Sequence, residues 1–241
     1  RLDSINLKDE LSILMRLPFD EDVEQEEQEY REATVYKLLA DYRKANHLHF
    51  SISQGFNQFE IHVQVPAGAP QLDTIRTLLL ILKKELNFPF RIGAGVSPSY
   101  ERSRYFAEHA LMEADRYGRN DAFFMDEEDK ITGPLSADNQ LMYNYSNEKA
   151  LAFARENGIN ETNILKLISI FEQDEAQLIS SHALSEKLGI TMRSASRILA
   201  KLYDLDMIRF RDTAPDTKTP RQGRPSHYYH FNPAAFREAL L

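Results

Sequence analysis

The chain has 241 residues, 42% hydrophobic and 27% charged, the usual composition of a globular protein with one large domain or two modest ones. It contains no cysteine, which excludes disulfides, thiolate zinc sites and a cysteine nucleophile and fits a reducing cytoplasm. The longest apolar run, residues 78–82, is far shorter than the roughly 20 residues of a membrane helix, so we expect a cytoplasmic protein without a membrane segment.

The formal net charge of −8 is distributed unevenly along the chain. Residues 179–241 hold ten lysines and arginines against six acids, a formal charge of +4, whereas the preceding residues carry −12. This asymmetry predicts an acidic domain joined to a basic one that can meet phosphates. The chain begins with Arg1 rather than Met, as a fragment with an upstream part removed would.

Strand-like and helix-like patterns alternate in the first half of the chain. We expect strands at 10–19, 90–98 and 122–127 (the last of this part), a hairpin at 48–65, and helices at 20–46, 71–86 and 100–118. The residues expected on the buried side of the first helix are Ala33, Val35, Tyr36, Leu38, Leu39 and Tyr42. Strands mixed with helices in this way predict a sheet-and-helix domain of the α+β or α/β kind, and we adopt α+β.

A polar, punctuated stretch at 133–147 predicts a domain boundary, after which the pattern is helical. We therefore divide the chain into a first domain at 1–132, a linker and connecting helix at 133–158, and a second domain at 159–241. Apolar residues in the segment 138–157 are the expected place for packing in a homodimer: Leu141, Met142, Tyr143, Leu151 and Phe153.

The second domain has the order of a winged helix-turn-helix, in which short helices precede two strands that flank a basic loop. Thr191 is a helix N-cap after a turn at 188–190. Four apolar residues share one face of the following helix at i, i+3, i+4 and i+7: Ala195, Ile198, Leu199 and Leu202. The residues expected to face the DNA major groove are Arg193, Ser194, Ser196, Arg197 and Lys201.

The segment between the strand-like stretches 208–210 and 227–231 is the expected wing. It carries Lys218, Arg221 and Arg224, and we expect Arg221 and Arg224 to contact the DNA backbone or minor groove. "GRPSHYYHF" resembles the wing-and-strand end of bacterial winged-helix repressors, a resemblance that covers about residues 160–232.

The stretch "RIGAGVSPSYERSRYFAEHALMEADRYGRNDAFFMDEE" (91–128) resembles the last third of a GGDEF domain, the diguanylate cyclase fold. The positions in register with that family are Ala107, Ala110, Leu111, Ala114, Gly118, Arg119 and Asn120. Extended backward, the resemblance spans about residues 8–130 and places the family's hairpin turn at 55–59. It implies a concavity between the hairpin and strand 93–97 that binds a small polar ligand.

The acids with which that family holds Mg²⁺ are missing. Asn57 and Gln58 stand in the turn, and Met15 and Leu17 stand in the first strand, so no anionic oxygen is available for the metal. Phe56 replaces a glycine that would admit a phosphate. We therefore expect a degenerate domain with no catalytic activity, metal or cofactor. Near the hairpin, His47, His49 and His62 lack the acid or cysteine partners of a zinc site and are interpreted as edge-strand residues.

The sequence thus predicts a bacterial transcription regulator: a GGDEF-like domain that senses a ligand or dimerises, followed by a winged helix-turn-helix. Expected partners are a double-stranded DNA operator, a small-molecule or nucleotide effector, and a second copy of the chain. Two alternatives stay open. One is a divergent nucleotide cyclase or hydrolase with a nucleic-acid-targeting domain, and the other is a pure protein-interaction module.

Overall fold

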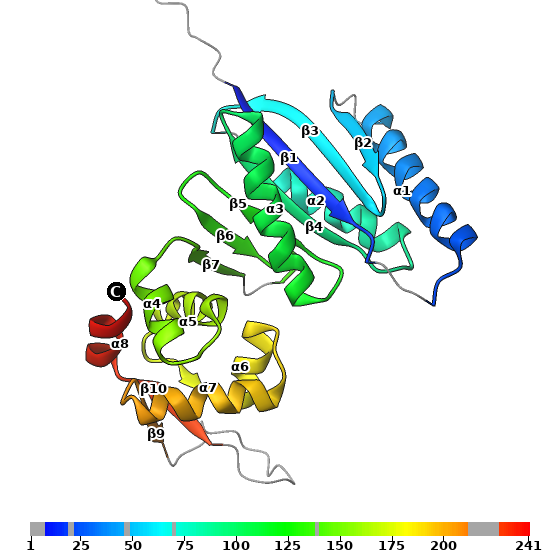
Figure 1. The fold of residues 1–241 in the computed structure, drawn as a ribbon. Helices are drawn as coiled ribbons and strands as arrows, with labels where there is room; N and C mark the ends of the chain where they lie inside the picture. Colours follow the sequence, from blue (N-terminus) through cyan, green and yellow to red (C-terminus); the bar gives the residue numbers. More distant parts are fainter. Residues whose placement is uncertain (1–7, 19–21, 46–48, 69–70, 138–139, 212–226) are drawn as a thin grey trace, which may run out of the picture. The chain divides into compact units, whose positions relative to one another are not determined.

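The computed structural model describes residues 8–18, 22–45, 49–68, 71–137, 140–211 and 227–241. The chain divides into two compact units, residues 1–140 and 141–241 (Figure 1). Both units combine helices with a sheet, which confirms the α+β class. No helix in these described ranges is both long enough and apolar enough to cross a membrane.

The first unit is built on a mixed sheet with strand order β2-β3-β1-β4-β5-β6. Its elements are β1 (Lys8–Arg16), α1 (Gln25–Ala45), β2 (Ser51–Gly55), β3 (Gln58–Pro66), α2 (Gln71–Glu85), β4 (Arg91–Ser97), α3 (Tyr100–Tyr117), β5 (Ala122–Met125) and β6 (Lys130–Gly133). β1 is antiparallel to both β3 and β4, and β4 is parallel to β5. The expectation that 122–127 is the last strand of this part was wrong, because β6 returns antiparallel to β5.

Helices cover both faces of this sheet. On one face, the alternate β1 residues Leu11, Ile13 and Met15 pack in a buried cluster with α1 and α2. On the other face, Leu14 packs against Ala107 and Leu111 of α3. In Figure 1, α2 and α3 lie on opposite sides of β1.

Helix α1 begins at Gln25, later than expected, and buries a narrower stripe than its apolar residues suggested. Val35 and Leu39 are buried. Ala33 is exposed and Tyr36 is 44% exposed, so the expected burial of these two residues was wrong. The reason is position: α1 lies beside the edge strand β2, where only a narrow side of the helix meets the core.

The second unit is mostly helical. Its elements are β7 (Leu141–Asn144), α4 (Glu148–Glu156), α5 (Glu161–Gln173), β8 (Leu178–Ile179), α6 (Ser181–Leu188), α7 (Met192–Asp204), β9 (Ile208–Arg211), β10 (Tyr228–Phe231) and α8 (Pro233–Leu240). β10 pairs antiparallel with both β8 and β9 in a small sheet of order β8-β10-β9. Phe171, Phe231 and Phe236 form an aromatic cluster in its core, with ring centroids 4.5–5.3 Å apart.

Candidate functional site

Helices α6 and α7 are joined by a short turn whose ends are fixed by local hydrogen bonds. Gly189 ends α6 at a φ of 69°, a left-handed conformation that glycine adopts without strain. Thr191 then caps α7, because its hydroxyl oxygen accepts a hydrogen bond from the Ser194 amide at 3.2 Å. The expected cap at Thr191 is confirmed, and the turn sets the direction in which α7 leaves α6.

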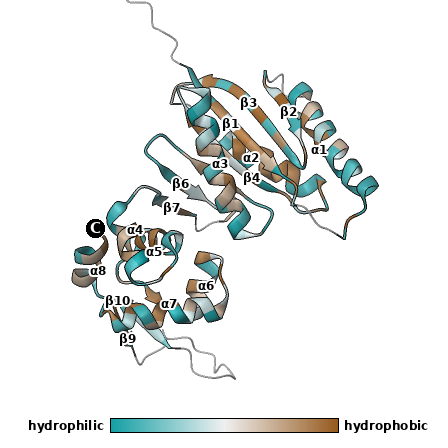
Figure 2. Cartoon of the chain, in the orientation of Figure 1, coloured by the Kyte–Doolittle hydropathy of each residue, from teal (hydrophilic) through white to brown (hydrophobic). Residues whose placement is uncertain are grey.

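One face of α7 is buried and the other is open. Ala195, Ile198, Leu199 and Leu202 are all at most 7% exposed, as the apolar spacing predicted. Figure 2 shows hydrophilic and hydrophobic residues alternating along this helix. Arg193 and Arg197 are exposed, and the structure gives neither of them an ion pair or hydrogen bond with any described residue. The outer face of α7 therefore carries two guanidinium groups one helical turn apart that are available to an anion.

The two serines expected on the same surface have partners inside the unit. The Ser194 hydroxyl lies 3.0 Å from that of Thr191, within the helix cap. The Ser196 hydroxyl donates to that of Ser181 at 2.9 Å and so links α7 to the start of α6. The Ser196 hydroxyl therefore helps to position α7 against α6, whereas the Ser194 hydroxyl belongs to the cap of α7 itself.

Lys201 is exposed but engaged at a second helix end. Its ammonium donates hydrogen bonds to the carbonyl oxygens of Asn157 at 2.7 Å and Gly158 at 2.8 Å, just after α4. A cation at a helix C-terminus satisfies carbonyls that have no partner within the helix and opposes the negative end of its dipole. We therefore assign Lys201 a role in holding α4 to α7.

Replacing Lys201 by alanine should lower the free energy of unfolding by about 1 kcal/mol, because both carbonyl oxygens lose a charged donor. Arg197→Ala is the matched control, and it should leave stability unchanged because Arg197 has no described partner. Denaturant unfolding of the two variants measures the difference. Equal stabilities would show that the Lys201 contacts contribute nothing.

The expected wing residues Lys218, Arg221 and Arg224 lie outside the described residues. Strand β9, which leads into that segment, carries two arginines that the sequence analysis did not select. Arg209 lies 3.6 Å from the Asp206 carboxylate, whereas Arg211 has no ion pair among the residues that the structure describes. The alternation Arg-Phe-Arg on a strand was the signal that could have identified them.

Lys187, a basic residue of α6, also has a partner inside the unit. The Lys187 ammonium donates to the Gln177 side chain at 3.0 Å. Burial lowers the pKa of Lys187 from its ordinary value, and the negative charge of Asp174 opposes that shift. Arg193, Arg197 and Arg211 are exposed and have no ion pair with any described residue, and together they form the candidate anion-binding surface.

In the first unit, the hairpin turn is closed by contacts with α1. Asn57 is 5% exposed and has a φ of 53°. Its backbone N–H donates a hydrogen bond to the Glu32 carboxylate at 3.1 Å. The same carboxylate accepts from Gln54 at 3.0 Å, so both of its oxygens have partners. Phe56, at the tip of the turn, is 77% exposed.

Met15 and Leu17, at the end of β1, are at most 2% exposed and belong to the apolar core. These side chains and the amides of the turn offer Mg²⁺ no anionic oxygen. The histidines do not gather there either. His62 lies 2.6 Å from Glu10, His47 is outside the described residues, and no cluster of three potential metal ligands occurs in the described ranges.

The glycines of β4 pack tightly against α3. A Cβ at Gly93 would lie 2.1 Å from the amide nitrogen of Leu111, and one at Gly95 would lie 2.4 Å from the carbonyl oxygen of Ser103. Close strand–helix packing therefore explains this "GAG" stretch, and no ligand can approach the two glycines from the α3 side.

A cavity of about 310 Å³ lies on the opposite face of the sheet, between α1 and α2. Its lining is mainly apolar and includes Ile13, Ile61 and Leu78, with Tyr42 and His49 as polar members. Burial raises the pKa of the Tyr42 phenol above its ordinary value.

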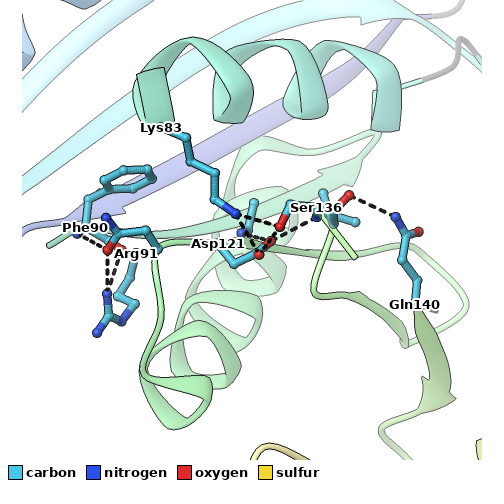
Figure 3. Close-up of polar contacts among 9 residues, drawn as sticks. Lys83, Phe90, Arg91, Asp121, Ser136 and Gln140 are labelled. Atoms are coloured by element: carbon cyan, nitrogen blue, oxygen red, sulfur yellow. Dashed lines mark hydrogen bonds and ion pairs between the residues drawn. The ribbon is translucent and has the colours of Figure 1, made fainter. Parts of the chain in front are cut away.

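A polar cluster around Asp121 links the start of β5 to the segment after β6 (Figure 3). Asp121 is 3% exposed and accepts hydrogen bonds from Lys83 at 3.2 Å, the Ser136 amide at 3.1 Å and the Ser136 hydroxyl. Lys83 also donates to the Ser136 hydroxyl at 2.6 Å. These contacts tie Lys83 of α2 to the start of β5 and to the segment after β6.

Asn120, the residue before Asp121, also holds distant segments together by hydrogen bonds. The Asn120 side chain accepts from the amide of Phe90 at 3.0 Å and from Arg91 at 3.2 Å, and it donates to the Phe88 carbonyl at 3.3 Å. These contacts fix the entry into β4. The "Gly-Arg-Asn" stretch therefore has a local structural role in this chain.

Comparisons with known proteins leave the site unassigned. No family model matches the chain, and no curated protein matches it either. A function for the chain therefore has to be argued from the residues and contacts described above.

Proposed function

We propose that the chain is a DNA-binding transcription regulator. Its second unit would bind an operator as a winged helix-turn-helix, and its first would be a catalytically inactive GGDEF-like domain that senses a ligand or dimerises. The observation that carries the proposal is the outer face of α7, where Arg193 and Arg197 are exposed and have no described partner. A recognition helix needs one stripe held by the core and the other free to reach base edges and phosphates.

The surrounding elements support this proposal. Three helices, α5, α6 and α7, are followed by β9 and β10, and β8 completes the small antiparallel sheet. The basic segment 212–226 connects β9 to β10, the place where a wing belongs. Arg211 lies at the end of β9, where it would extend the basic surface toward that segment.

Two sets of contacts in the first unit support the GGDEF-like interpretation: the packing of β4, α3 and β5, and the position of the hairpin turn beside β1. The resemblance is strongest over β4, α3 and β5, which pack together, with β4 and β5 parallel. The turn of the hairpin β2–β3 lies beside the end of β1, since the Leu17 amide donates to the Asn57 carbonyl at 2.8 Å. Without carboxylates at those positions, the unit would bind or dimerise rather than catalyse phosphoryl transfer.

A homodimer is part of the proposal, because helix-turn-helix proteins read paired half-sites with two-fold symmetry. The segment proposed for that contact is 138–157, of which 138–139 lie outside the described residues. Leu141 and Tyr143 are buried within the chain, whereas Met142 is 52% exposed. Met142 is therefore the residue of this segment best placed to meet a partner.

The test is a selection of duplexes from a random DNA pool by the full chain, followed by titration at several salt concentrations. We expect two chains per selected duplex and an association constant that falls linearly with salt on a logarithmic plot, by about 0.9 per phosphate contact. Binding that is absent, or independent of salt, would contradict the proposal. In a parallel assay with GTP and Mg²⁺, turnover that disappears in Gln58→Ala would favour the enzyme alternative.

A further inference from the structure

A second cavity of the first unit, about 360 Å³ in volume, lies at the N-terminal end of α2. Its apolar lining comes from Leu72, Val96 and Phe124, and its charged lining from Asp9, Asp73 and Arg76. The volume is within the range of small-molecule sites, which combine an apolar surface with a few polar groups that fix orientation. This mixed lining is what a ligand with one apolar part and one charged part requires.

Gln71, the first residue of α2, also lines this cavity and is the strongest sign of a ligand. The side chain is only 7% exposed, yet its amide nitrogen has no hydrogen-bond partner. A buried N–H group without an acceptor is unfavourable, and such groups are rare in folded proteins. An oxygen of a bound molecule would supply the missing acceptor.

The charges around the cavity are of both signs. Arg76 donates to the Asp73 carboxylate at 3.3 Å and to the Gln140 side chain at 2.9 Å, so its guanidinium is held at the rim. The N-terminal end of α2 adds a partial positive charge next to Gln71. The Asp9 carboxylate, which also lines the cavity, accepts a long hydrogen bond from the Gly68 amide at 3.3 Å. Asp9 therefore retains the capacity to accept from a cation.

We propose that this cavity binds an α-amino acid with an apolar side chain. The ligand carboxylate would accept from the Gln71 amide nitrogen beside the N-terminus of α2, with Arg76 nearby. The ammonium group would meet the Asp9 carboxylate. The apolar side chain would cover Leu72, Val96 and Phe124. This proposal deepens the sensing role of the first unit by naming the class of effector, and it can be tested without DNA.

The first experiment is calorimetric titration of the full chain with free leucine, valine, methionine and phenylalanine. Two analogues of leucine separate the charges: 4-methylpentanoate lacks the ammonium group, and isoamylamine lacks the carboxylate. We expect at least one of the four amino acids to bind. We also expect 4-methylpentanoate and isoamylamine each to bind at least tenfold more weakly than leucine. If none of the amino acids binds, or if an analogue binds as tightly as its parent, the proposal is wrong.

The second experiment uses Gln71→Leu, which keeps the size of the side chain and removes the unpaired N–H group. We expect this variant to melt at the same or a higher temperature than the parent chain but to lose the amino-acid-induced rise in melting temperature. Gln54→Leu, on β2 outside the cavity, is the matched control and should keep that rise. An undiminished rise in Gln71→Leu would overturn the site.

The variant Arg193→Ala keeps this test distinct from the DNA-binding proposal. Arg193 lies in the second unit, so this variant should bind the amino acid with the affinity of the parent chain. Arg193→Ala should lose DNA affinity and keep amino-acid binding. In the parent chain, failure of DNA binding with retained amino-acid binding would count against the regulator proposal alone, whereas DNA binding without amino-acid binding would count against the cavity alone.

Discussion

Replacing Arg193 or Arg197 by alanine should weaken binding to the selected duplex by about 1–3 kcal/mol and relax the base preference at the position that the side chain reads. Both side chains project from the exposed face of α7, and the buried stripe on the opposite face prevents the helix from turning them away. Neither arginine has a partner among the described residues, so each substitution would remove the proposed DNA contact without leaving a buried group unpaired. Titration on selected and scrambled duplexes measures both effects.

Arg155→Ala is the matched control for this pair. Arg155 is an exposed arginine of the same unit, but it lies on α4 and is paired with Glu161 at 2.6 Å. We expect its DNA affinity to equal that of the parent chain. Unchanged affinity in Arg193→Ala and Arg197→Ala as well would remove the basis for the DNA-binding proposal.

Arg221 and Arg224, which belong to the segment proposed as the wing, should behave differently. If they contact phosphates, each alanine substitution should weaken binding evenly across sequences and lower the salt slope by roughly one. A loss confined to the selected duplex would instead indicate a base contact in the minor groove.

Replacing Gly93 by alanine should destabilise the first unit by about 3 kcal/mol, the upper end of the usual range for overpacking. The added methyl carbon would lie 2.1 Å from the Leu111 amide nitrogen and 2.3 Å from the Ala107 carbonyl oxygen. Because these are backbone atoms of α3, no side-chain rotation can make room, and the helix itself must move off β4. Denaturant unfolding, or soluble yield where the variant does not fold, measures the loss.

Gly55→Ala is the control substitution, since it makes the same chemical change at an open position. Its nearest neighbour would be the Gln58 carbonyl oxygen at 4.0 Å. We expect equal or slightly higher stability, because alanine loses less conformational freedom than glycine in a strand. If Gly93→Ala proved as stable as Gly55→Ala, the close approach of β4 to α3 would be incorrect.

Local patterns in the sequence predicted the boundaries of several elements because they depend on residues close together in the chain. Helix α3 follows the expected range: the Ser99 hydroxyl accepts from the Arg102 amide at 3.3 Å, and Gly118 ends the helix at a φ of 72°. The buried stripe of α7 was predicted for the same reason, since a spacing of three and four places residues on one face of any helix. That residues 15, 17, 57 and 58 carry no carboxylate is likewise read from the sequence alone.

Only the tertiary structure decided which of those exposed or polar residues have partners. Lys201 lies on the basic side of α7 in the sequence, but its ammonium holds carbonyl oxygens more than forty residues away. Strand β6 could not be recognised from four residues, and its pairing with β5 defines it. The sequence could not predict that the side-chain amide nitrogen of Gln71 is buried without a hydrogen-bond partner, because this depends on the packing of α2 over β4 and β5. Residue spacing specifies which way a side chain faces on its own helix or strand, whereas its contacts depend on which distant segments are packed there.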